Sequence, residues 1–357
     1  MGGGSSLRRL APAWRWLGLA LLSALLAALL EGLRLPAALL LGPMAAAVLF
    51  AIGGAGLALP APAFFLAQGV VGVMVAGNLP AEVFDEIARD APIFLAGTAS
   101  TVAVASLIGW LLARSGTLPG TTAIWGSTPG AATTMTVMSA DYGADMRLVA
   151  VMQYLRVVCC ALAAMLVALL LGARTLGEQH VDWFPAQPWG AVAGTLAIAA
   201  AGAFLGARLR LPGGAVLLPM GAGMAVQLGG LMPVTLPPTV LAVSYALIGW
   251  AIGINFDRAV LAHAARVLPR LLASILALIA ASAACGLLLV LLAGIDPLTA
   301  LLATSPGGAD SIAIIATATR ADIPFVMAMQ VARFLLVVLA GPALARLLSG
   351  ERGRRSR

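Results

Sequence analysis

Two short polar segments interrupt apolar stretches of the sequence and contain residue types that could bind a ligand. They are Ser127, Thr128, Pro129 and Gly130 in the first half of the chain, and Thr304, Ser305, Pro306, Gly307 and Gly308 in the second. Proline at the first position of a helix loses no hydrogen bond, and a preceding hydroxyl caps free N–H groups. The residue before proline is disfavoured in helical angles, so the stretch before it must end there. We therefore expect two half-helices whose free N–H groups and positive dipole ends favour an anionic ligand.

A second set of polar residues follows each break at a constant spacing. It consists of Asp145, Gln153 and Arg156 after the first break, and of Asp322, Gln330 and Arg333 after the second. On a helix, Gln153 lies about 80° and Arg156 about 20° around the axis from Asp145, so the three share one face. Arg156 also lies about 16 Å deeper than Asp145, given the rise of a helix. An arginine inside the membrane indicates a function, which makes Gln153, Arg156 and their second-half counterparts candidate ligand residues.

The same residues have a purely structural interpretation, which stays open at this point. Arg156 and Arg333 could cap carbonyl groups of the breaks, or pair with Asp310 and Asp145 as internal struts. Asp310 has no acidic counterpart in the first half, where Thr133 takes its place. A carboxylate beside a Pro-Gly-Gly segment is a candidate for coupling a proton or cation to transport, and Asp145 and Asp322 are further candidates.

The elements that must position these residues belong to a chain far more apolar than a soluble protein. Hydrophobic residues make up 61% of its 357 residues, charged residues make up 10%, and the mean hydropathy is +1.03. Soluble domains have about 45–50% apolar and about 25% charged residues. Stretches such as 14–33, 91–113 and 268–293 reach the roughly 20 apolar residues of a bilayer span. The composition predicts an all-α polytopic membrane protein whose surroundings are the lipid bilayer.

The chain repeats itself at an offset of 177 positions, and the repeat is carried by distinctive residue types. This shift places Pro129 on Pro306, Gly130 on Gly307, Asp145 on Asp322, Gln153 on Gln330, Arg156 on Arg333, Gly72 on Gly249 and Pro92 on Pro269. Chance matches in such a chain would be mostly alanine, leucine and valine. A duplication is therefore indicated.

Each half is expected to contain the same series of apolar segments. In the first half they are 14–33, 36–53, 63–78, 91–113, the interrupted 118–141, and 144–171; in the second they are 188–209, 212–231, 238–255, 268–293, the interrupted 297–319, and 322–348. We divide the chain into membrane repeat 1 (1–171), a linker (172–187), membrane repeat 2 (188–349) and a basic cytoplasmic tail (350–357).

The positive-inside rule favours two inverted repeats of about five transmembrane helices each. If each interrupted segment is re-entrant and the N-terminus is cytoplasmic, most arginines of the loops and termini lie on the cytoplasmic side of the membrane. Only Arg34, Arg89, Arg174 and Arg320 then fall outside. If each interrupted segment crosses as a discontinuous helix, the bias disappears. The first arrangement places both termini in the cytoplasm, and the crossing alternative stays open.

The sequence provides no support for enzyme, metal or nucleic-acid chemistry. Its two histidines, His180 and His263, are far apart in the sequence and form no ligand cluster for copper or zinc. The net charge of +7 comes from arginines scattered through short loops and the tail, with no basic face for nucleic acid. No phosphate-binding loop or nucleophile motif is present. We expect no catalytic residue, cofactor or metal.

The two most distinctive blocks resemble a known family. They are "STPGAATTMTVMSADYGADMRLVAVMQYLRVV" and "TSPGGADSIAIIATATRADIPFVMAMQVARFLLV". They are similar to the duplicated module of the bacterial AbrB-type inner-membrane proteins, and the resemblance covers about 34–348. It implies a multi-pass protein of the bacterial inner membrane. Members are often labelled regulators of gene expression, and some are labelled ammonia monooxygenases, a label that the want of copper ligands argues against here.

Together, the breaks and the resemblance predict a secondary transporter of a small anionic solute that works by alternating access. Paired discontinuous helices in inverted repeats are a sequence pointer to a transporter's binding site. The alternative is a membrane-bound regulator of gene expression without transport. The sequence names neither the solute nor the coupling ion, and it leaves formation of a homo-oligomer open.

Overall fold

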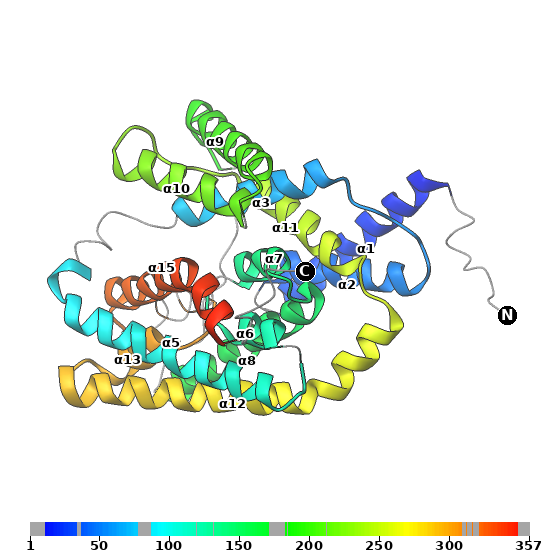
Figure 1. The fold of residues 1–357 in the computed structure, drawn as a ribbon. Coiled ribbons are helices and arrows are strands. Elements are labelled where there is room, and N and C mark those ends of the chain that lie inside the picture. The colour runs from blue at the N-terminus through cyan, green and yellow to red at the C-terminus, as the bar shows by residue number, and fades with distance from the viewer. Residues whose placement is uncertain are drawn as a thin grey trace. The chain divides into compact units, whose positions relative to one another are not determined.

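The structure is a computed structural model that describes residues 11–33, 37–77, 87–118, 120–130, 132–170, 183, 185–211, 213–308, 312, 316 and 321–348. Asp310, the tail at 350–357 and most of the linker at 172–187 therefore lie outside the described residues. Every regular element of the described chain is a helix (Figure 1). The all-α class expected from composition is confirmed for this part of the protein.

The predicted apolar segments correspond to helices, most of them to within a few residues. In the first half these are α1 (Pro12–Gly32), α2 (Ala38–Ile52), α3 (Ala61–Gly77), α5 (Ala91–Arg114), α6 (Gly120–Ser127), α7 (Ala132–Asp141) and α8 (Met146–Leu170). In the second half they are α9 (Trp189–Arg208), α10 (Gly214–Leu228), α11 (Pro238–Gly253), α12 (Arg258–Ala293), α13 (Pro297–Thr304) and α15 (Ile323–Leu348). The interrupted segment 118–141 is indeed two helices, α6 and α7.

One predicted boundary is wrong, because α12 begins at Arg258 rather than near 268. The charged residues before Pro269 suggested a loop that ends at a helix-starting proline. Instead Asp257 caps the helix, accepting a hydrogen bond from the backbone N–H of Val260 at 2.8 Å. Pro269 then lies inside the helix. The residues between are mainly alanine, leucine and arginine, which favour a helix enough for it to continue through one proline.

Five helices of the described chain are long and apolar enough to cross a bilayer. They are α1, α5, the Met146–Ala164 part of α8, α9 and α12. Their outward faces are apolar as well: α1 exposes Leu17, Leu21, Leu25 and Leu29 at four-residue spacing. One face of a helix covered with leucine suits contact with lipid tails and not with water. The helices are therefore compatible with a multi-pass membrane protein.

The chain forms two compact units, and each unit takes one segment from each half of the sequence. Unit 1 comprises Met1–Leu79 and His180–Ala265, and unit 2 comprises Pro80–Gln179 and Arg266–Arg357. The units thus cut across the repeats defined by sequence. Equivalent parts of the two repeats end up within one unit.

Unit 1 is built by an exchange of partners between the repeats. Helix α2 packs against α11, and α10 packs against α3, while α1 lies on α2 and α9 on α10 (Figure 1). Glycine makes the exchanged contacts close. A Cβ at Gly72 of α3 would lie 2.4 Å from the carbonyl oxygen of Val216, and a Cβ at Gly249 of α11 would lie 2.7 Å from that of Leu40. The two glycines are 177 positions apart, so the same contact is made twice.

Candidate functional site

The first break has the position that the sequence predicts but different capping. Helix α6 ends at Ser127, residues 128–130 are not helical, and α7 begins at Ala132. We expected the hydroxyls to cap the following helix. Instead the Thr128 hydroxyl donates to the carbonyl oxygen of Ile124 at 2.7 Å, in the helix before it. The last carbonyls of a helix lose their own partners where the helix stops, so a nearby hydroxyl satisfies them.

The second break repeats this arrangement where it is described. Helix α13 ends at Thr304, whose hydroxyl donates to the carbonyl oxygen of Ala300 at 2.9 Å. Its start is capped by Asp296, which accepts from the backbone N–H of Thr299 at 2.9 Å and is followed by proline. Ser305, Pro306, Gly307 and Gly308 follow as non-helical chain.

Gln153 and Arg156 of α8 bind the carbonyl end of α6. The amide Nε2 of Gln153 donates to the carbonyl oxygens of Trp125 at 2.7 Å and Thr128 at 3.1 Å. Arg156 donates from Nη1 to the same Thr128 oxygen at 2.9 Å and from Nη2 to Oε1 of Gln153 at 2.6 Å. The two side chains, as predicted, share a face of one helix, and together they satisfy the carbonyls left open by the break.

Gln330 and Arg333 of α15 make the same network 177 positions later. Nε2 of Gln330 donates to the carbonyl oxygens of Leu302 at 2.9 Å and Ser305 at 3.3 Å. Arg333 donates from Nη1 to the Ser305 oxygen at 2.7 Å and from Nη2 to Oε1 of Gln330. The capping role, left open by the sequence, is therefore present in both halves.

Each break also packs against the long helix of the other repeat. A Cβ at Gly130 would lie 3.2 Å from Cγ1 of Val337 on α15, and a Cβ at Gly307 would lie 3.3 Å from Cβ of Cys160 on α8. Cys160 and Val337 are themselves 177 positions apart. Gly308 faces Val157 of α8 at 3.5 Å in the same way. The structure thus brings both predicted breaks together around α8 and α15 within unit 2.

The two arginines are buried without a carboxylate partner among the described residues. Arg156 is 1% exposed and Arg333 is 4% exposed. The groups that accept their hydrogen bonds are carbonyl and amide oxygens. These contacts satisfy N–H groups but leave two positive charges buried in the protein, where charge is costly unless it is compensated.

Asp145 and Asp322 are helix caps in this structure. Asp145 accepts from the backbone N–H of Arg147 at 3.0 Å and pairs with its guanidinium at 2.8 Å. Asp322 accepts from the backbone N–H of Phe325 at 3.1 Å. The predicted alternative in which Asp145 pairs with a deep arginine is therefore wrong, because Arg147 occupies its carboxylate. Burial raises the pKa of Asp145, but Arg147 outweighs burial and holds that pKa below its usual value.

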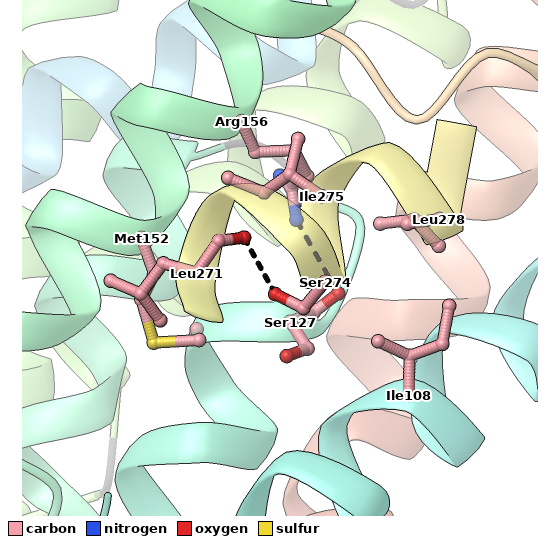
Figure 2. Close-up of a pocket in the computed structure, with 9 residues that line it drawn as sticks. Ile108, Ser127, Met152, Arg156, Leu271, Ser274, Ile275 and Leu278 are labelled. Atoms are coloured by element: carbon pink, nitrogen blue, oxygen red, sulfur yellow. Dashed lines mark hydrogen bonds between the residues drawn. The ribbon is translucent and has the colours of Figure 1, made fainter. Parts of the chain in front are cut away.

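A small cavity borders Arg156 and brings in a helix that sequence reasoning missed. Its polar lining is Ser127, Arg156 and Ser274, and apolar residues of α5, α8 and α12 complete it (Figure 2). The volume open to the centre of a water molecule is about 10 Å³, so the cavity has room for about one water molecule. Ser274 is one of two serines in the apolar helix α12, and its spacing relates it to neither break, so the sequence contains no signal for it.

Comparisons with known proteins show the family of this chain. The family model described as "Transition state regulatory protein AbrB" matches residues 39–349. The chain belongs to the AbrB family. A protein of Escherichia coli (strain K12) named "Putative regulator AbrB" is 44% identical over 347 residues, covering 97% of this chain and 99% of its own. A second relative, "Uncharacterized protein YhjN" of Bacillus subtilis (strain 168), is 27% identical over 273 residues, covering 71% of this chain and 70% of its own.

Proposed function

We propose that this AbrB-family member is a secondary transporter of a small anionic solute in the bacterial inner membrane. The observation that carries the proposal is the pair of buried arginines at paired helix breaks, with no carboxylate partner among the described residues. Their hydrogen bonds to carbonyls satisfy geometry but do not neutralise charge. An anionic solute that reaches the breaks would compensate both charges. After the solute dissociates, the protein would return to the packed state seen in this structure.

We propose further that the two repeats have opposite orientations in the membrane, as in many carriers that work by alternating access. We propose five spans in each repeat, re-entrant breaks, and cytoplasmic termini. Support comes from the arginine bias of the sequence and from the network that recurs at the 177-position offset.

Cysteines placed at the equivalent positions Arg89 and Arg266 test this orientation. In a variant without the native cysteines, we expect a membrane-impermeant maleimide to label Arg89→Cys from the outside only and Arg266→Cys from the cytoplasmic side only. The measurement is labelling of intact cells and of inverted vesicles. Labelling of both positions from one side would show parallel repeats and contradict the proposed topology.

The transport proposal is tested with purified protein in liposomes. A thermal-shift screen of small carboxylates and amino acids first selects a solute, and counterflow of that radiolabelled solute is then measured. We expect Arg156→Gln and Arg333→Gln each to lower the flux at least about tenfold, because each removes a charge-assisted contact of about 1.5–3 kcal/mol. Arg147→Gln, which removes the pair with Asp145 and leaves both deep arginines in place, is the matched control. Flux that survives in both deep variants would refute the assignment of the arginines.

A second candidate function is regulation without transport, favoured by the names of the family and of the Escherichia coli relative. It would act through a protein partner bound by the basic tail at 350–357 or by the 257–267 segment, which is largely helix in the structure. Regulation that survives removal of the tail and alanine substitution of the exposed 257–267 residues would exclude it.

A further inference from the structure

The two arginines, equivalent by sequence, have different surroundings. The Nε of Arg156 is buried with no hydrogen-bond partner among the described residues. Arg333 donates from Nη1 and Nη2 to Ser305 and Gln330, and its side chain is slightly more exposed, at 4%. A buried N–H without a partner costs about 1–3 kcal/mol, more when the group is charged. Arg156, which lines the cavity, therefore has one buried charged donor, Nε, without a hydrogen-bond partner among the described residues.

The packing of two equivalent methionines differs between the breaks and bears on the space beside Arg156. At the break of the second half, Met329 points at Gly97 of α5: a Cβ there would lie 2.8 Å from its terminal methyl carbon. At the break of the first half the equivalent positions are Met152 of α8 and Ser274 of α12. Met152 instead packs on Gly126, where a Cβ would lie 2.3 Å from its sulfur. Space between Arg156 and Ser274 is left open as a result.

The polar groups around this space suit a single small acceptor atom. Ser127 lines it from the end of α6, Arg156 from α8 and Ser274 from α12 (Figure 2). The Ser274 hydroxyl currently donates to the carbonyl oxygen of Leu271 at 2.7 Å, a bond it can exchange by one rotation. Each of the three residues that line the space carries a hydrogen-bond donor. The size of the space limits the occupant to roughly one water-sized atom.

We propose that Ser127, Arg156 and Ser274 form an anion subsite that takes one halide ion or one oxygen of a carboxylate. The inference rests on the proposed function, because it takes the ligand to be an anion. It adds to that function by giving Arg156 and Arg333 different roles. Arg156 contacts the anion through Nε, whereas Arg333 contributes its positive charge and uses its N–H groups to hold its own break. Ser274 makes α12 the third wall of the site.

The test is anion-dependent stabilisation of the full chain in detergent, measured as the midpoint of thermal unfolding. Sodium chloride or sodium formate replaces sodium gluconate at constant ionic strength, gluconate being too bulky for the space. We expect saturable stabilisation by at least one of the two small anions. A response to chloride identifies a halide site, and a response to formate alone identifies a site for carboxylate oxygen.

Matched variants locate the binding. Ser274→Val fills the space and removes the hydroxyl, and Arg156→Lys keeps the charge but removes Nε. Each is expected to weaken the apparent affinity at least about tenfold, since one hydrogen bond to a charged group is worth about 1.5–3 kcal/mol. Ser282→Val, at a 1% exposed serine of the same helix that does not line the cavity, and Arg333→Lys should leave the affinity nearly unchanged. If Ser274→Val does not fold, Ser274→Ala takes its place.

The outcomes separate this inference from the transport proposal. Absence of saturable stabilisation, unchanged affinity in folded Ser274 variants, or equal losses in Arg156→Lys and Arg333→Lys would each overturn the subsite. Anion binding that depends on Ser274, without counterflow of any solute, would support the subsite and refute transport. Counterflow that depends on Arg156 but not on Ser274 would support transport and refute the subsite.

Discussion

Leucine in place of Gly72 is expected to prevent unit 1 from forming its native packing. A Cβ at this position of α3 would lie 2.4 Å from the carbonyl oxygen of Val216 and 3.3 Å from the backbone nitrogen of Met220. Both atoms belong to the backbone of α10, so no side chain can move aside, and the two helices must separate. Overpacking of a core costs about 1–3 kcal/mol even where side chains can adjust, so we expect the larger value or more.

The same result is expected for Gly249→Leu, because its Cβ would lie 2.7 Å from the carbonyl oxygen of Leu40 and 2.9 Å from the nitrogen of Met44. Size-exclusion profiles and thermal unfolding of detergent-purified protein measure both changes. Gly221→Leu is the control, since this glycine lies on an exposed face of α10 with no atom within 4 Å of a Cβ. A Gly72→Leu protein as stable as Gly221→Leu would show that α3 and α10 do not pack as described.

The helix breaks could be predicted because their cause is local. A hydroxyl pair before Pro-Gly ends a helix by the geometry of the chain itself, whatever surrounds it. The shared face of Gln153 and Arg156 is local as well, because it follows from helical periodicity alone. These features were therefore found at their correct positions from the sequence.

The choice of hydrogen-bond partner could not be predicted, because it depends on which atoms lack one after folding. Thr128 could cap the helix after it or serve the one before it, and the sequence does not rank these. Asp145 likewise had Arg147 two residues away and Arg156 three turns away as possible partners, and took the nearer. The prediction of where α12 begins was wrong for a related reason. It required Asp257 to be recognised as the residue that caps the helix.

Long-range packing lay beyond the sequence entirely. The exchange of α2 and α10 between repeats, and the approach of Ser274 to Arg156, bring together residues that are far apart in the chain. Both depend on the shapes of surfaces that only the folded chain presents. The 177-position offset shows that two halves are alike, but it does not show how they interlock.

Leucine in place of Gln153 is expected to destabilise unit 2 by about 3 kcal/mol, because it takes hydrogen bonds from three buried groups, of which only the Thr128 oxygen keeps another donor, Arg156. The change removes the donor to Trp125 and Thr128 and the acceptor of Arg156. The acceptor matters most, since it serves a buried guanidinium. Gln330→Leu should cost nearly the same, because its network is equivalent.

Gln68→Leu separates this effect from the mere loss of a buried glutamine. Gln68 of α3 is 4% exposed, and its side chain makes no hydrogen bond to another described residue. Removing it leaves no partner unsatisfied in that part of the chain, so leucine there should be neutral or stabilising. Midpoints of thermal unfolding, compared among the three variants, measure the difference. Equal midpoints for Gln153→Leu and Gln68→Leu would mean that the carbonyl ends of the breaks do not depend on the glutamine, and that arginine alone is enough to hold them.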